Sequence, residues 1–259
     1  MGSIEIERHS RGVVRLVMNH QESGNGLGEA FRGFLLPAFQ ELFADRQCRV
    51  IVLASGLKNF SVGGDLSKMD TLADPKAGRA RLTSAHRLAR LLLSAEKPMV
   101  AEVCGFAVGA GAGLALFCDT IVMGDGATIG FPFPKVGLAP DFAIAHTLPQ
   151  RIGHARARQA LLYARFFKAP DALAVGLADD VVPDEQLTAK ALERAGELAE
   201  FPSHAAALTK RMLTLSEDAQ AVLDFEATAQ PLCFASDDFR EGLAAFREKR
   251  KPRFDSDIE

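Results

Sequence analysis

The order of elements along the chain is the strongest constraint on its fold, because a helical pattern, a short buried strand and a glycine-rich stretch follow one another twice. Residues 30–45 place apolar side chains at helical spacing, and the wholly apolar run 50–54 follows. The same order returns with residues 79–95 and 99–104. Apolar, β-branched runs bounded by helices are typical of strands covered on both faces. The sequence therefore predicts an α/β protein with covered sheets.

The two ends of the chain carry different patterns. Residues 4–18 alternate apolar and polar side chains around a central turn, which predicts a hairpin. From Asp184 onward Ala, Leu, Glu and Lys dominate, and only helical periodicity remains. No low-complexity tract or linker separates the two parts. We therefore predict a core over residues 1–195 and a packed helical region over residues 196–259.

Composition limits the class of protein. Hydrophobic residues make up 48% and charged residues 24%, with a formal net charge of -3, so we expect an ordinary globular protein that binds no nucleic acid. No apolar run approaches the length of a membrane span, and the N-terminus shows no leader pattern, so we expect a cytoplasmic protein with no membrane partner. The four cysteines are scattered without a CxxC pair, so no metal site is predicted.

Two glycine-rich stretches are the first candidates for chemistry. Residues 59–66 follow one predicted strand, and residues 105–113 follow the other. Glycine at a strand exit lets a ligand approach the backbone closely and leaves N–H groups free to donate. The second stretch also begins a predicted helix, whose first turn carries unsatisfied N–H groups. Together they could polarise one oxygen atom; the alternative is that the glycines only form turns and allow close packing.

Further motifs follow in order along nearly the whole chain. They occupy residues 50–54, 60–66, 97–98, 105–111, 118–119, 176–178, 181–183, 239–246 and 249–252. Each is weak alone, but the ordered set resembles the crotonase (enoyl-CoA hydratase/isomerase) superfamily. The resemblance implies a spiral of ββα units followed by a C-terminal helical trimerisation region. It also implies a homotrimer or dimer of trimers that binds an acyl-CoA thioester, with no cofactor beyond the coenzyme A moiety of the substrate.

By the same resemblance, the backbone N–H groups of Gly64 and Ala110 would hold the thioester oxygen. Such donors stabilise the enolate that forms when a proton leaves the carbon next to the carbonyl, and losing one costs on the order of 3 kcal/mol of barrier. The residues expected to contact substrate are Lys58, Val62, Gly63, Leu66, Phe106, Phe131 and Phe133. The phenylalanines indicate an apolar or aromatic acyl pocket, although they are also ordinary packing material.

The acid and base differ from those of the hydratases. Hydratases of this superfamily add water with two glutamates, and the resemblance places these at Gly113 and Phe133, neither of which can transfer a proton. Asp141 lies in a loop where other branches of the superfamily keep a functional aspartate. Burial beside phenylalanines would raise its pKa toward the range useful for proton transfer. The alternative is that Asp141 caps a helix.

His86 is the second candidate for acid–base chemistry. It lies in the predicted helix 79–95, in the segment that contributes to the acyl pocket in the superfamily. Its place on an apolar stripe with Leu82, Ala89 and Leu93 equally favours a structural histidine. Taken with the resemblance, these residues imply an enoyl-CoA double-bond isomerase that uses an enolate. The alternatives are a ring-opening isomerase, an aryl-CoA dehalogenase-like enzyme, or a non-catalytic acyl-CoA-binding protein.

Overall fold

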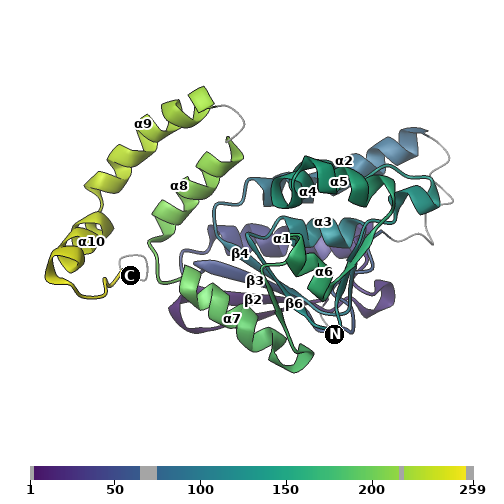
Figure 1. Cartoon of the computed structure of the whole chain (residues 1–259), viewed down its shortest axis with the longest axis horizontal. Helices are drawn as coiled ribbons and strands as arrows, with labels where there is room; N and C mark the ends of the chain where they lie inside the picture. Colours follow the sequence, from purple (N-terminus) through teal and green to yellow (C-terminus); the bar gives the residue numbers. More distant parts are fainter. Residues whose placement is uncertain (1–2, 65–74, 216–218, 255–259) are drawn as a thin grey trace.

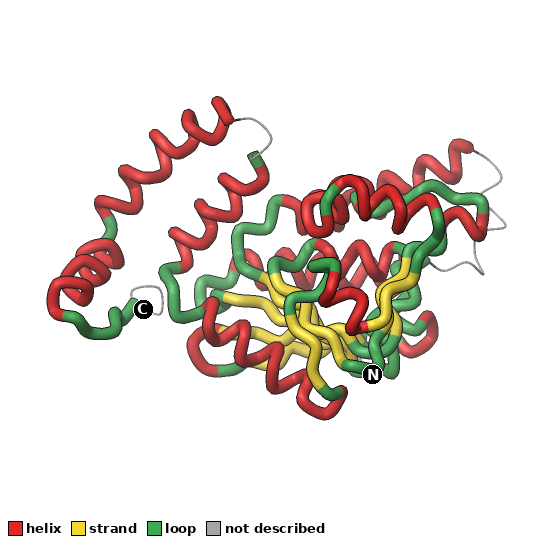
Figure 2. The backbone as a smooth tube through the Cα atoms, viewed as in Figure 1, coloured by secondary structure: helices red, strands yellow, loops and turns green. Residues whose placement is uncertain are grey.

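The computed structural model describes residues 3–64, 75–215 and 219–254 of the 259-residue chain. Helices cover both faces of a central sheet, and three C-terminal helices extend to one side of this body (Figure 1). The secondary structure alternates between strands and helices up to the last strand and is helical thereafter (Figure 2). The predicted change of pattern near Asp184 is therefore present.

The main sheet begins with the predicted hairpin. Strand β1 (Ile4–Arg8) pairs antiparallel with β2 (Val13–Met18). The strands β3 (Val50–Ser55), β4 (Met99–Val103), β6 (Thr120–Gly124) and β9 (Asp180–Val182) then add in parallel, in the order β1-β2-β3-β4-β6-β9. The central strands β3 and β4 are almost wholly buried, as their apolar runs predict.

A second, smaller sheet carries one of the glycine-rich stretches. It consists of β5 (Phe106–Val108), β7 (Thr128–Gly130) and β8 (Phe166–Lys168), in the order β5-β7-β8. Six helices lie on one face of the main sheet (Figure 1). They are α1 (Glu29–Ala44), α2 (Pro75–Leu93), α3 (Ala110–Leu116), α4 (Ile144–Ile152), α5 (His154–Leu162) and α6 (Ala169–Ala174). This arrangement is an α/β fold with helices packed against its sheets, as the sequence predicts.

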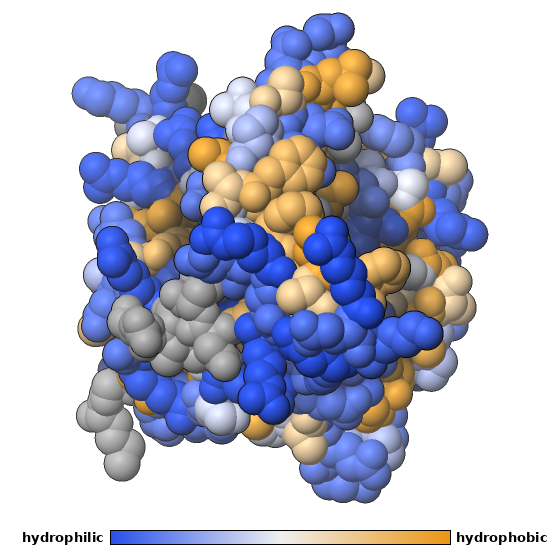
Figure 3. Space-filling model, turned by 90° about the vertical axis from the view of Figure 1, so that its left-hand side faces the viewer, coloured by the Kyte–Doolittle hydropathy of each residue, from blue (hydrophilic) through white to orange (hydrophobic). Residues whose placement is uncertain are grey.

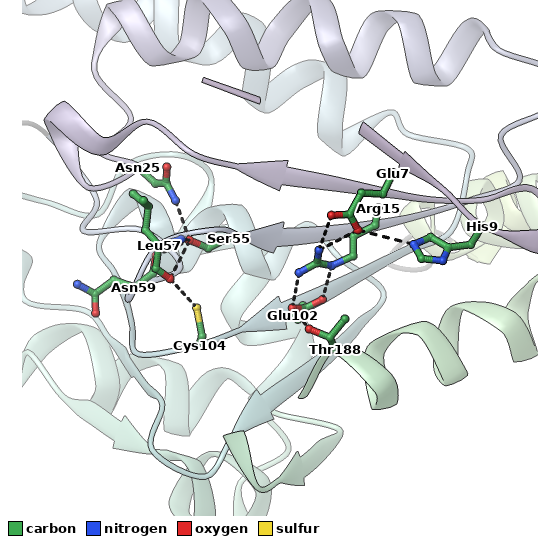
Figure 4. A network of polar contacts seen from close by, with 10 residues as sticks. All are labelled: Glu7, His9, Arg15, Asn25, Ser55, Leu57, Asn59, Glu102, Cys104 and Thr188. Atoms are coloured by element: carbon green, nitrogen blue, oxygen red, sulfur yellow. Dashed lines mark hydrogen bonds and ion pairs between the residues drawn. The ribbon is translucent and has the colours of Figure 1, made fainter. Parts of the chain in front are cut away.

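Helix α7 (Leu187–Leu198) covers the opposite face of the main sheet. Its small and apolar side chains pack on a valine layer that includes Val52 and Val100. Beside this layer, the buried carboxylate of Glu102 pairs with both Arg15 Nε and Nη2 at 2.8 Å and accepts from Thr188 of α7 (Figure 4). Packing on this face of the sheet includes Ala195 and continues to Ala199, the residue that follows α7. The boundary between the core and the helical region after residue 195 stays a prediction.

The C-terminal helices leave a broad apolar surface in contact with solvent. They are α8 (Ser203–Thr214), α9 (Ala219–Ala235) and α10 (Asp237–Glu248). Exposed apolar side chains include Leu213, Leu232, Phe234 and Phe246, the last 81% exposed. Figure 3 looks onto the end of the molecule at which these helices lie, and apolar side chains gather near the centre of that face. Among the described residues, no helix has the length and apolar character needed to cross a membrane.

Candidate active site

The two glycine-rich stretches lie side by side. Ser61 and Ala107 form a parallel bridge, in which Ser61 N donates to Phe106 O and Val108 N donates to Ser61 O, both at 3.0 Å. Gly63 adopts a φ of +90°, and a Cβ at this position would overlap the carbonyl oxygen of Val108. Only glycine permits this approach. The position of that Cβ is 3.6 Å from Ala110 N, so the first stretch touches the start of α3.

The backbone N–H groups of Gly64 and Ala110 are the ones predicted to hold the thioester oxygen. Ala110 is the first residue of α3, and N–H groups in the first turn of a helix have no partner within that helix. Within the described part of the chain, neither N–H donates a hydrogen bond to a protein acceptor. Two unused donors from adjacent segments can hold a carbonyl oxygen or the enolate oxygen derived from it.

Asn25 supports the first stretch from behind, and sequence reasoning did not single it out. Its side chain is fully buried, and its amide nitrogen lies 2.9–3.2 Å from oxygens of Met18, Ser55 and Phe60. Its own carbonyl accepts from Ser61 Oγ at 2.7 Å. Figure 4 shows its contact with Ser55. These bonds tie the stretch to the end of β3 before any ligand binds.

Asp141 lies in a strained turn that leads into α4. The two following residues, Phe142 and Ala143, adopt φ values of 52° and 61°, which non-glycine residues rarely do. The N-cap of α4 is Ala143, without a side-chain cap, so Asp141 does not cap this helix. Instead, Asp141 Oδ1 is buried and has no hydrogen-bond partner among the described residues. A buried carboxylate oxygen without a partner is unusual in a folded protein and is consistent with a role toward a ligand.

Opposing influences act on the pKa of Asp141. Burial, the largest of them, raises this pKa above the ordinary value, and the charges of Arg81, His86 and Arg32 oppose the rise. The structure therefore brings the two candidate acid–base residues, Asp141 and His86, within electrostatic reach of each other. They come from separate elements, the turn before α4 and helix α2.

The helical stripe predicted around His86 is wrong in part. Of its three members only Ala89 is buried, whereas Leu82 and Leu93 are 41% and 37% exposed. The buried face of α2 passes instead through Leu88, Ala89 and Leu92. His86 is half-buried. The reason is that only a narrow face of α2 contacts the rest of the protein, and apolar spacing in the sequence does not show which of several possible faces this is.

Hydrocarbon occupies the positions at which the resemblance places the hydratase glutamates. A Cβ at Gly113 would lie 3.0 Å from Ile144 Cγ1 and 3.2 Å from Phe142 Cδ1. Phe133 is buried, and its ring edge lies 3.8 Å from the Cβ position of Gly109 in the second stretch. This part of the site is apolar, and proton transfer near it depends on groups from other segments.

The remaining predicted contact residues lie in different surroundings. Val62 in the first stretch and Phe106 in the second are exposed, and so is Lys58, which directly precedes the first stretch. Phe131 is 0% exposed and packs edge-on against Phe167, so the structure places it in the core with no surface for a ligand. Leu66 lies outside the described residues.

The close approach at Gly63 predicts a large effect of a small substitution. Gly63→Ala should lower the free energy of unfolding by roughly 2 kcal/mol, because the new Cβ adds a clash with Val108 to an unfavourable φ. Gly137→Ala is the matched control: its φ of +70° is similar, but the Cβ would meet no neighbouring atom, so we expect a loss of roughly 1 kcal/mol. Urea unfolding of both variants measures the difference, and equal losses would contradict the close approach.

Comparison with known proteins decides the family. A sequence model described as enoyl-CoA hydratase/isomerase matches residues 8–257. The chain belongs to this family. It is 34% identical to crotonyl-CoA hydratase of Syntrophomonas wolfei over 79% of each chain. It is 31% identical to the bovine mitochondrial enoyl-CoA hydratase domain-containing protein 2, over 95% of this chain and 85% of that one.

Solved structures of the enoyl-CoA hydratase/isomerase family have the same fold. Enoyl-CoA hydratase of Bacillus anthracis superimposes with a TM-score of 0.90 at 26% identity, over 98% of this chain and 99% of that one. The resemblance to the crotonase superfamily found in the sequence is thereby confirmed, and the protein is a crotonase-family enzyme of acyl-CoA chemistry.

Proposed function

We propose that this family member moves a double bond within an enoyl-CoA thioester. The observation that carries the proposal is the buried, unpartnered carboxylate oxygen of Asp141 in an active site whose implied hydratase positions are Gly113 and Phe133. A single carboxylate can shuttle one proton between two carbons, whereas water addition by the family's usual route needs two acid–base groups.

The proposed reaction conserves atoms and charge. Asp141 removes an allylic proton, and the electrons of the broken C–H bond move into the conjugated system and onto the thioester oxygen. The N–H groups of Gly64 and Ala110 hold that oxygen while it carries negative charge. The same carboxyl then returns the proton at another carbon, and the double bond is left in its new position.

A second candidate follows from the electrostatic interaction between Asp141 and His86. In a dehalogenase-like reaction, Asp141 would attack the halogen-bearing ring carbon of the acyl group, and the carbon–halogen bond would break with loss of halide. His86 would then activate the water that hydrolyses the resulting ester, which releases the hydroxylated ring and the free carboxylate. The chain contains no tryptophan, which removes one aromatic group associated with that branch of the superfamily. A covalent Asp141 ester, detected by mass spectrometry after incubation with an aryl acyl-CoA, would favour this candidate.

The proposed function is tested by following 3-enoyl-CoA and crotonyl-CoA esters by mass spectrometry with deuterium oxide as solvent. We expect double-bond migration and little hydration, and deuterium should enter the product only to the extent that the proton held by Asp141 exchanges with solvent before it is returned. Hydration of crotonyl-CoA as fast as that of a true hydratase would contradict the proposal. Binding of the esters without any turnover would instead indicate a non-catalytic acyl-CoA-binding protein.

Restoring one glutamate should not create a hydratase. In Gly113→Glu the new side chain has to displace Phe142 and Ile144, which lie 3.0–3.2 Å from its Cβ. We expect a loss of about 1–3 kcal/mol of stability from overpacking and no gain in hydration. The double variant Gly113→Glu/Ile144→Ala has more room and serves as the comparison. Efficient hydration by the single variant would show that the apolar filling is not what excludes this chemistry.

The assembly belongs to the same proposal. A homotrimer or dimer of trimers would cover the exposed apolar side chains of α8–α10, of which Phe246 is the most exposed. Analytical ultracentrifugation measures the assembly directly, and Phe246→Glu should weaken it. A monomer at micromolar concentration would contradict this part of the proposal.

A further inference from the structure

Arg32 is a buried cation whose donors are not all used by the protein. It lies on α1 and is 6% exposed. Its Nη1 donates to the carbonyl oxygen of Leu27 at 2.6 Å, and its Nη2 donates to Ser84 Oγ at 3.3 Å. Both acceptors are neutral. Arg32 Nε is buried and has no hydrogen-bond partner in the part of the chain that the structure describes. A guanidinium at this depth is stabilised when an anion accepts its free donor.

The contacts of Arg32 link it to the first glycine-rich stretch and to helix α2, which carries His86. Leu27, which accepts from Arg32, donates its own N–H to Gly63 O at 2.6 Å, directly before the oxyanion donor Gly64. Ser84 lies on α2, two residues before His86. The charges of Arg32 and Asp141 also act on each other. Arg32 is therefore part of the surroundings of the reacting chain and not of a distant surface.

A second arginine, Arg81, acts electrostatically on both Arg32 and Asp141. Arg81 lies on α2, one turn before Ser84. Burial and then Arg81 lower the pKa of Arg32, and Glu29 and Asp141 oppose this. Glu29, in the first turn of α1, is exposed. An acyl chain that ends in a methyl group would leave Arg32 Nε without an acceptor, whereas a terminal carboxylate would supply one.

We propose that Arg32 and Arg81 bind a carboxylate at the far end of the acyl chain, so that the preferred substrate is a coenzyme A thioester of a dicarboxylic acid. The inference rests on the proposed function, which puts the thioester oxygen at Gly64 and Ala110 and the reacting carbons near Asp141. The carboxylate lies beyond the carbon that Asp141 deprotonates, and it completes the hydrogen bonds of Arg32. Arg32 and Arg81 are specificity residues in this arrangement, and the acid–base chemistry stays with Asp141.

The test compares unreactive esters, so that it does not depend on turnover. Adipoyl-CoA and hexanoyl-CoA have acyl chains of equal length, but the first ends in a carboxylate and the second in a methyl group. Isothermal titration calorimetry on the wild-type protein should show adipoyl-CoA binding about tenfold or more tightly. The pairs succinyl-CoA with butyryl-CoA and suberoyl-CoA with octanoyl-CoA locate the chain length at which the preference is largest.

Variants assign the preference to the two arginines. Arg81→Met should remove most of the preference for adipoyl-CoA over hexanoyl-CoA. Arg32→Lys keeps the charge but loses the guanidinium donors, so it should reduce this preference. The affinity for hexanoyl-CoA should change little in either variant. Arg87→Met is the matched control on an exposed position of α2 and should keep the full preference. Equal affinities for every pair in the wild type, or a preference that survives both substitutions, would overturn the inference. A preference without isomerisation would leave it standing and contradict only the proposed reaction.

Discussion

Asp141→Asn is expected to lower kcat for double-bond migration by about 10²–10⁴-fold, the usual contribution of a positioned acid–base group. The amide has nearly the shape of the carboxylate but cannot accept and return the proton. The affinity for the unreactive hexanoyl-CoA should therefore change little. Asp125→Asn, in an exposed turn, is the matched control and should keep full activity. An active Asp141→Asn variant would remove Asp141 from the proposed reaction.

The pH dependence of the reaction tests the same residue without changing it. Burial raises the pKa of Asp141, so kcat/KM should rise with pH as this carboxyl loses its proton, with a midpoint above the ordinary aspartate value. The rising limb should be missing from the residual activity of Asp141→Asn. A limb at the ordinary aspartate pKa would show that the base is solvated and not buried.

Loss of activity in Asp141→Asn should not be accompanied by loss of stability. The pKa of Asp141 is higher in the folded than in the unfolded protein, so the folded state binds this proton more tightly. By linkage, the stability that comes from this carboxyl is fully present below the unfolded pKa and is lost as pH rises through the folded pKa. At pH 7 the neutral amide should therefore give an equal or higher Tm. A clearly lower Tm would point to a structural role for the carboxylate.

Ala110→Pro is expected to lower kcat by about 10²–10³-fold, because it deletes one of the two N–H groups proposed to hold the enolate oxygen. The position suits the substitution: Ala110 is the first residue of α3, where proline is favoured and no intrahelical hydrogen bond is lost. Thermal unfolding should show that the helix and the fold are kept.

A matched variant separates the N–H from the side chain at this position. Ala110→Ser adds a polar atom but keeps the backbone donor, so it should lose far less activity than Ala110→Pro. If the two variants lose activity equally, packing around Ala110 and not its N–H is what the reaction needs. If Ala110→Pro is fully active, the oxygen is held elsewhere.

Elements with a strong local period could be predicted from the sequence. The helix at α1 and the buried strands β3 and β4 were predicted to within a few residues, because apolar spacing over such lengths admits one secondary structure. The strands β8 and β9 were not predicted, since each has only three residues and exists through pairing with a strand far away in the sequence. Short elements of this kind have no period of their own.

The amino-acid sequence by itself determined the family, the two glycine-rich stretches and the candidate Asp141, because these depend on residue types at fixed spacing along the chain. Tertiary structure alone decided what surrounds them. Phe131 and Phe133 are only two residues apart in the sequence, yet the fold packs Phe131 against Phe167 in the core and Phe133 beside Gly109 of the second glycine-rich stretch. It also brought Arg32 from α1 and Arg81 from α2 into the electrostatic surroundings of Asp141. How deeply a site residue is buried, and which charges lie near it, depend on segments that are distant in the sequence, and only folding brings those segments together.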